Sequence, residues 1–407
     1  MKELLSHLSA RAQRLYDSDI QDMIELVHQN QALSFTAGEP SEDLLPLEKL
    51  RSSFAAAFDR GPEMLTYYHD SDGHEDLRRW IASWMRSDGL IPSCMDWKQL
   101  MLTTGSHEGI NITAEGLIDP GDSIAVEAPS YAEALLTFSK EGAAFFGLEM
   151  DQEGPRPESL ELLARQHRIK LLYTIPNFQN PSGRVTSPRR RREILELAKK
   201  YDFLILEDDP YRHLYYDAPP PGTYLAMKEN DGRVIYLGSF SKLIAPGIRC
   251  GWMIAPPELY GKFHQIRVTN DLNLPTILHE GIFRFLSDYD FQEHLTTLRR
   301  AYGEKRNGMV KALQKHIAPE DFAYDLPKGG FFLWGRAPWL QNSMEFAKFA
   351  VTEDKIGIIP GEIFFTSPEN YRDTLRLSFA KVSPEKAEEG CARLARSIER
   401  YKRQRQV

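Results

Sequence analysis

Lys242 lies in the sequence context most suggestive of chemistry. It lies in the stretch LGSFSKLIAPGIRCGW (residues 237–252), just after a strand-like run and after Ser239 and Ser241, and Arg249 follows seven residues later. Hydroxyl and guanidinium groups bind phosphate, and an unprotonated lysine amine is a nucleophile. The pattern predicts a reactive amine beside a phosphate site, and the plain alternative is a lysine on a surface loop.

Polar and aromatic residues follow four other strand-like runs. They are Ser106 and His107, Tyr131, Asn180, and Asp208 with Tyr211. Taken singly, each has an ordinary structural explanation, such as a helix cap, a packed ring or a turn. A ring that carries a phosphate, a protonatable nitrogen and an aldehyde would use all of them together. The joint pattern therefore predicts pyridoxal 5′-phosphate as the cofactor.

The elements that must position these residues alternate along the chain. Short apolar runs are separated by helical patterns such as HEGINITAEGLI and RREILELAKKYD. This alternation is typical of a mostly parallel sheet covered by helices, in which the loops after the strands line the ligand crevice. The runs expected to be strands are 99–104, 123–128, 170–175, 203–207, 233–239 and 251–255.

The pattern changes near residue 286, where a long helical stretch leads to FFLWG, IGIIPG, TLRLSFA and a final helix. We therefore expect an α/β fold with three parts. Residues 46–285 form a large cofactor domain and residues 286–407 a smaller α+β domain. Residues 1–45 are expected to pack with the small domain.

Composition excludes several classes of protein. The 407-residue chain has a net charge of -8, so a nucleic-acid partner is not expected. Its basic run Arg189–Arg192 opens a helical pattern and is interpreted as a solvated face. Three scattered cysteines suggest neither a metal site nor disulfides, and no apolar run predicts a membrane span or a secretion signal. We expect a cytoplasmic protein.

With these motifs in place, the chain resembles a fold-type I pyridoxal-phosphate enzyme of the class I/II aminotransferase family. Within the family it is most similar to the 2-aminoadipate and kynurenine aminotransferase branch. The resemblance runs from SFTAGEP (34–40) to LRLSFA (375–380), and SFSKLIAPGIRCGW, NPSG and ILEDDPY are its most specific segments. It implies an aspartate aminotransferase-like fold with a seven-stranded large sheet. It also implies ping-pong transfer of an amino group from an L-amino acid to a 2-oxo acid.

The resemblance also implies roles for single residues. Lys242 matches the lysine that forms an imine with the cofactor and then moves a proton, and Asp208, rather than Asp209, matches the acid at the ring nitrogen. Tyr211 and Asn180 match the partners of the phenolic oxygen, and Tyr131 matches the stacking ring. Ser106, His107, Ser239, Ser241 and Arg249 match the phosphate site. Arg376 matches the arginine that binds the substrate α-carboxylate, and Gly38 matches a backbone position near the substrate.

Two further matches concern the dimer and the substrate. Tyr68, with Tyr67 as the alternative, matches the tyrosine that reaches the phosphate of a neighbouring subunit, which implies a homodimer with shared active sites. Gln21 in Ser18–Asp22 replaces an arginine that is common in the branch. This change disfavours a long dicarboxylic substrate and leaves aromatic, aliphatic or glutamate-like donors open.

Two other functions are compatible with parts of the pattern. The same lysine and ring could serve a lyase or a cyclising enzyme. An aminotransferase-like effector sensor would need a DNA-binding domain, and only about 33 residues precede SFTAGEP.

Overall fold

The computed structural model describes residues 2–66 and 71–405. Its central feature is an eight-stranded sheet with the order β2-β9-β8-β7-β6-β3-β4-β5. The strands are β2 (Leu100–Thr103), β3 (Ser123–Ala128), β4 (Ala144–Asp151), β5 (Gly154–Pro155), β6 (Ile169–Thr174), β7 (Leu204–Asp208), β8 (Val234–Ser239) and β9 (Gly251–Ile254). The six predicted runs all form strands, but β4 and β5 were not predicted.

The sheet is mostly parallel. Strands β3, β4, β6, β7 and β8 pair in parallel, whereas β9 is antiparallel to both of its neighbours and β5 is antiparallel to β4. Parallel strands buried on both faces are continuously apolar, and β8 is buried along its whole length. The predicted α/β fold class is confirmed, with the short β5 as one strand more than expected.

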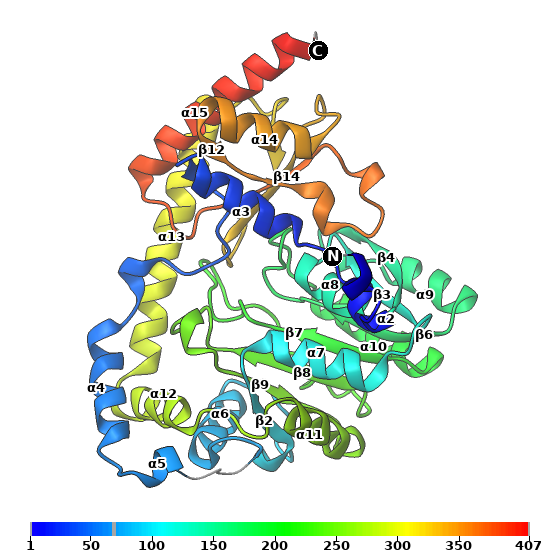
Figure 1. The fold of residues 1–407 in the computed structure, drawn as a ribbon, viewed down its shortest axis with the longest axis vertical. Helices are drawn as coiled ribbons and strands as arrows, with labels where there is room; N and C mark the ends of the chain where they lie inside the picture. Colours follow the sequence, from blue (N-terminus) through cyan, green and yellow to red (C-terminus); the bar gives the residue numbers. More distant parts are fainter. Residues whose placement is uncertain (1, 67–70, 406–407) are drawn as a thin grey trace.

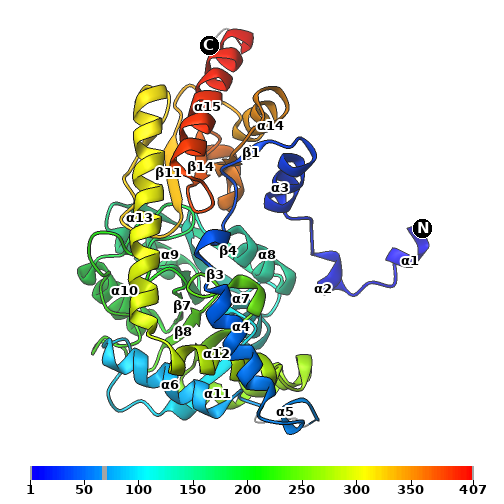
Figure 2. The same cartoon turned by 90° about the vertical axis from the view of Figure 1, so that its left-hand side faces the viewer.

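Helices cover both faces of this sheet, with α9 and α10 on one side and α7 and α8 on the other (Figure 2). The helices of this part are α4 (Leu47–Phe58), α5 (Glu63–Thr66), α6 (Glu75–Ser87), α7 (Ser106–Leu117), α8 (Ala132–Glu141), α9 (Pro157–Gln166), α10 (Pro188–Tyr201), α11 (Pro257–Asp271) and α12 (Thr276–Asp288).

Helix α10 shows how local sequence fixes an element and where our interpretation was wrong. The Ser187 side chain caps its first turn, Pro188 occupies its first position, and the helix ends at Asp202 in a left-handed conformation. Only half of the basic run at its start is a solvated face, because Arg189 and Arg192 are exposed whereas Arg190 and Arg191 are buried. Arg191 donates hydrogen bonds to the carbonyl oxygens of Thr186 and Pro176, which satisfies its buried guanidinium.

A second hydrophobic core lies at one end of the sheet (Figure 1). Its residues pack around a four-stranded sheet of order β10-β11-β14-β13 and around the paired strands β1 and β12. Its elements are β1 (Leu33–Ser34), β10 (Ala323–Tyr324), β11 (Phe332–Arg336), β12 (Ile356–Gly357), β13 (Ile359–Pro360), β14 (Thr374–Ser378), α3 (Asp19–Gln29), α14 (Ser343–Asp354) and α15 (Pro384–Arg405).

Helix α13 (Phe291–His316) connects the two cores. Leu295 and Leu298 pack in the core of the large sheet, whereas Met309 and Leu313 pack in the second core. The domain boundaries at residues 45/46 and 285/286 stay predictions. Helix α1 (Lys2–Leu5) extends away from both cores (Figure 2), whereas α2 (Ala10–Gln13) contacts α8 through an ion pair of 2.6 Å between Arg11 and Glu141. No helix of the described residues is both apolar enough and long enough to cross a membrane.

Candidate active site

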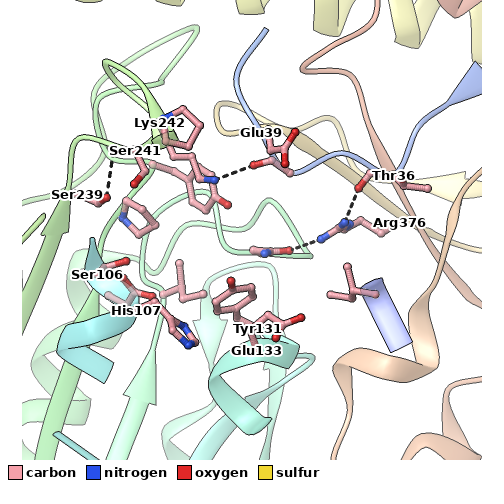
Figure 3. Close-up of a pocket in the computed structure, with 18 of the residues that line it drawn as sticks. Thr36, Glu39, Ser106, His107, Tyr131, Glu133, Ser239, Ser241, Lys242 and Arg376 are labelled. Atoms are coloured by element: carbon pink, nitrogen blue, oxygen red, sulfur yellow. Dashed lines mark hydrogen bonds between the residues drawn. The ribbon is translucent and has the colours of Figure 1, made fainter. Parts of the chain in front are cut away.

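One cavity of about 250 Å³ collects the predicted site residues at the carboxyl ends of the strands. All the predicted residues that the structure describes line it: Gly38, Ser106, His107, Tyr131, Asn180, Asp208, Tyr211, Ser239, Ser241, Lys242, Arg249 and Arg376. They come from both cores, and many are visible in Figure 3. Tyr68 and Tyr67 lie outside the described residues.

Lys242 presents its amine to the cavity from the loop after β8. Its Nζ donates a hydrogen bond of 2.8 Å to the carbonyl oxygen of Gly38 (Figure 3). Burial lowers the pKa of the amine to about 8, and the charges of Arg249 and Arg376 add to this effect, while Glu39 and Asp208 oppose it. A substantial neutral fraction of the amine is therefore available near neutral pH.

Asp208 ends β7 and is buried. The Tyr173 hydroxyl donates to its Oδ2 at 2.9 Å, whereas its Oδ1 has no hydrogen-bond partner among the described residues. Burial raises the pKa of Asp208 to about 7, although the hydroxyls of Tyr173 and Ser106 act to lower it. A buried carboxylate with a free oxygen fits a positively charged N–H group as its missing partner.

Asp209 is oriented differently. Its Oδ1 accepts a hydrogen bond of 2.7 Å from Asn177, and its Oδ2 is paired with Arg212. Because Asp209 is already satisfied by these structural contacts, Asp208 is the acid that the cavity leaves available.

Backbone and hydroxyl groups form an anion-binding arrangement at the start of α7. Gly105 has a φ of +89° and precedes Ser106, the first residue of the helix. The positive φ of Gly105 favours glycine, and a Cβ atom there would lie 2.8 Å from the Arg249 guanidinium and would displace it from the start of the helix. Arg249 donates to Ser241 Oγ at 3.5 Å. A helix N-terminus, hydroxyls and an arginine together suit a phosphate.

Aromatic and amide side chains line the remaining wall. Tyr131 precedes α8, and Tyr211 contacts Phe332 edge to face at 5.9 Å between ring centroids. Burial raises the pKa values of both Tyr131 and Tyr211. His107 Nε2 lies 3.3 Å from Thr137 Oγ1, and burial lowers the pKa of its imidazole. His107 is therefore neutral near pH 7.

Arg376 reaches the cavity from the middle of β14. It donates to Asn180 Oδ1 at 3.0 Å and to the Thr36 carbonyl oxygen at 2.8 Å (Figure 3). Its guanidinium carbon lies 4.3 Å from the centroid of the Phe332 ring, and its buried Nε has no partner among the described residues. Burial lowers the pKa of Arg376 to about 10, so it stays charged at neutral pH. Two of its five N–H donors are used, which leaves donors for a carboxylate.

Several residues of the cavity were not predicted. Ile20 and Ile24 enter from α3 beside Gln21, which the sequence had suggested only as a missing charge. Glu133 enters from α8, and Thr36 and Glu39 come from the segment after β1. A weak signal for Glu133 was its position two residues after Tyr131. Tyr173, the partner of Asp208, was also not predicted, because it lies within an apolar strand-like run and resembles an ordinary core residue.

These residues fit pyridoxal phosphate. The free Oδ1 of Asp208 suits a protonated ring nitrogen, the Lys242 amine suits an aldehyde, and the start of α7 with Arg249 suits a phosphate. Among the described residues, no group of three or more His, Cys, Asp and Glu side chains could hold a metal ion.

Known proteins resemble this chain along nearly its whole length. The family model described as aminotransferase class I and II matches residues 31–394. Aromatic-amino-acid aminotransferase 1 of Thermococcus litoralis is 33% identical over 397 residues, which cover 96% of this chain and 94% of that protein. The 2-aminoadipate transaminase of Thermus thermophilus is 33% identical over 389 residues and 95% of each chain. The crystal structure of Pyrococcus horikoshii kynurenine aminotransferase, at 30% identity, covers 98% of each chain with a TM-score of 0.91.

Proposed function

Since the chain belongs to the class I and II aminotransferase family and is a pyridoxal-phosphate-dependent transaminase acting on an amino acid and a 2-oxo acid, we propose which amino donor it uses and which residues bind the cofactor and the substrate. The donor is an L-amino acid with an aromatic or aliphatic side chain. The observation that carries this choice is that α3 borders the cavity with Gln21, Ile20 and Ile24, none of which is a cation that could pair with a distal carboxylate.

When bound, the cofactor supplies an aldehyde that takes up the amino group and a ring that accepts the electron pair left when the Cα proton departs. Lys242 supplies the amine that holds the cofactor in the resting enzyme and afterwards carries the proton. Its lowered pKa favours both roles, because a neutral amine can attack a carbonyl carbon and accept a proton.

Asp208 would hold the ring nitrogen of the cofactor in its protonated form. Its Oδ1, which has no partner among the described residues, would accept a hydrogen bond from that nitrogen, while Tyr173 holds the other oxygen in place. Asp208 would in turn be favoured in its ionised form by such a positive partner. Tyr211 and Asn180 are proposed to contact the phenolic oxygen, and Tyr131 to stack on the ring.

The phosphate is anchored by Ser106, Ser239, Ser241, Arg249 and the backbone around His107. Arg376 binds the α-carboxylate of each substrate with its unused donors. The surrounding Phe332 and Phe364 rings exclude water from one side of the guanidinium, which strengthens that ion pair.

We also propose a homodimer. Leu47 and Phe58 of α4 and Leu65 of α5 are large apolar side chains that stay exposed in the single chain. A partner subunit would bury them and would place Tyr68 at the neighbouring phosphate. A cytoplasmic location stays a prediction.

The test uses the purified holoenzyme and single amino acids, each with a 2-oxo acid acceptor. We expect stoichiometric formation of a new amino acid with phenylalanine, tyrosine or leucine as donor, and much slower transfer from 2-aminoadipate. Lys242→Ala should lose the visible absorption of the bound cofactor on dialysis and all transfer. Release of ammonia without an acceptor would instead show lyase chemistry and contradict the proposal.

A further inference from the structure

Glu133 is a charged residue of the cavity that the roles above leave unused. It lies in the first turn of α8 and borders the cavity beside Tyr131 and His107 (Figure 3). Its charge is felt by both neighbours, since it acts to raise the pKa of Tyr131 and that of His107, although burial dominates in each case.

The position of Glu133 is fixed by the N-terminal segment. Ser18 is the N-cap residue of α3, and its hydroxyl group donates a hydrogen bond to Glu133 Oε1, with 2.5 Å between the two oxygen atoms. Ser18 also accepts a hydrogen bond from the Gln21 backbone N–H, so α3 and Glu133 are held together. Among the described residues Glu133 has no cationic partner, and its second carboxylate oxygen is left for a ligand.

The other charged groups of the cavity already have uses. Lys242, Arg249 and Asp208 serve the cofactor, and Arg376 serves the substrate α-carboxylate. Burial lowers the pKa of the His107 imidazole and so favours its neutral form.

The substrate side chain is left with the wall formed by α3 and the first turn of α8. Glu133 is the charged residue of this wall. Glu39 at the rim is paired with the Lys381 amine at 3.2 Å, so Glu133 is the carboxylate of this wall that has no cationic partner among the described residues. This part of the cavity therefore attracts hydrogen-bond donors and repels anions.

We propose that Glu133 is a specificity-determining residue, which favours amino donors whose side chain ends in a hydrogen-bond donor and rejects substrates with a distal carboxylate. The inference rests on the proposed function and deepens it. Because a ping-pong enzyme receives both substrates in one cavity, the same charge selects the acceptor. Pyruvate and other 2-oxo acids without a second carboxylate are then better acceptors than 2-oxoglutarate.

Binding of unreactive analogues tests this apart from catalysis. The probes are glutarate, 3-phenylpropionate and 3-(4-hydroxyphenyl)propionate, titrated by calorimetry into the holoenzyme, Glu133→Gln, and the control Glu158→Gln on the exposed face of α9. Glutamine keeps the size of the side chain and an oxygen for Ser18. We expect Glu133→Gln to tighten glutarate binding by about tenfold, since it removes one like charge at low dielectric. Binding of 3-phenylpropionate should stay the same, and the hydroxyphenyl analogue should lose its advantage over it.

A kinetic arm measures kcat/KM for pyruvate and for 2-oxoglutarate with one amino donor. We expect their ratio to fall by about tenfold in Glu133→Gln and to stay unchanged in Glu158→Gln. Equal glutarate binding by wild type and Glu133→Gln would overturn the inference while leaving the transaminase intact. Parallel loss of all three analogues would also overturn it, because Glu133 would then only position α3. Failure of every donor and acceptor would instead count against the proposed function.

Discussion

Asp208→Asn should make the apoprotein more stable while it weakens the enzyme. In the unfolded chain the carboxyl ionises at its ordinary pKa of 3.8, whereas burial in the fold raises that pKa to about 7. Between these values the folded protein holds a proton that the unfolded chain has released, so the free energy of unfolding falls as the pH rises. The shift corresponds to about 4 kcal/mol of lost stability above pH 7.

Asparagine does not titrate, so this loss is absent in the variant. The difference in unfolding free energy between apo Asp208→Asn and apo wild type should be near zero below pH 3.8 and grow to about 4 kcal/mol above pH 7. The holoenzyme variant should lose at least about 10²-fold in kcat, because the ring nitrogen loses its charged partner.

The assay is urea unfolding of both apoproteins across this pH range, followed by circular dichroism, with activity measured after adding the cofactor. Asp209→Asn is the matched control. It breaks a buried pair with Arg212 and should lower stability near neutral pH. A difference independent of pH, or an Asp208→Asn apoprotein less stable than wild type near pH 8, would refute the reasoning.

Three further outcomes follow from the site. Arg376→Lys should lower kcat/KM for both substrates by about 10²-fold, because lysine cannot bind a carboxylate bidentately, while the cofactor absorbance stays unchanged; an unaltered KM would argue against its role. The rate of cofactor capture by the apoprotein should rise with pH through about 8, where Lys242 becomes neutral, and a flat stopped-flow profile would contradict this. Mixed dimers of Lys242→Ala and Tyr68→Ala should regain activity, since one of their two sites is complete; no recovery after confirmed subunit exchange would argue against a shared site.

The sequence predicted the residues that gather in the cavity better than it predicted the strands and contacts around them. Lys242 and Ser106 follow strands and Asp208 ends one, and the continuous apolar runs of these strands are visible in the sequence, so topology brings the three residues together at one edge. Strand β4 was missed because it is only partly buried and carries Gly147 and Glu149, which weaken the strand pattern.

Contacts between distant segments could not be predicted. Ser18 and Glu133 are 115 positions apart, and nothing in the sequence around either residue indicates that the two are paired. Similarly, Arg191 looks like a surface residue within a basic run, and only the fold shows its buried acceptors. The local pattern of apolar residues in the sequence indicates which face of a helix or strand is buried. Which polar groups pair with one another depends on the tertiary arrangement.

Arg376 belongs to the second core, but its hydrogen-bond acceptors are Asn180, from a loop of the large sheet, and Thr36, from the segment after β1. A substrate carboxylate at this guanidinium would touch the junction of three chain segments at once. The free energy of carboxylate binding would then stabilise one relative position of these three segments. Substrate recognition and rigidity of the whole subunit would thus depend on the same few atoms.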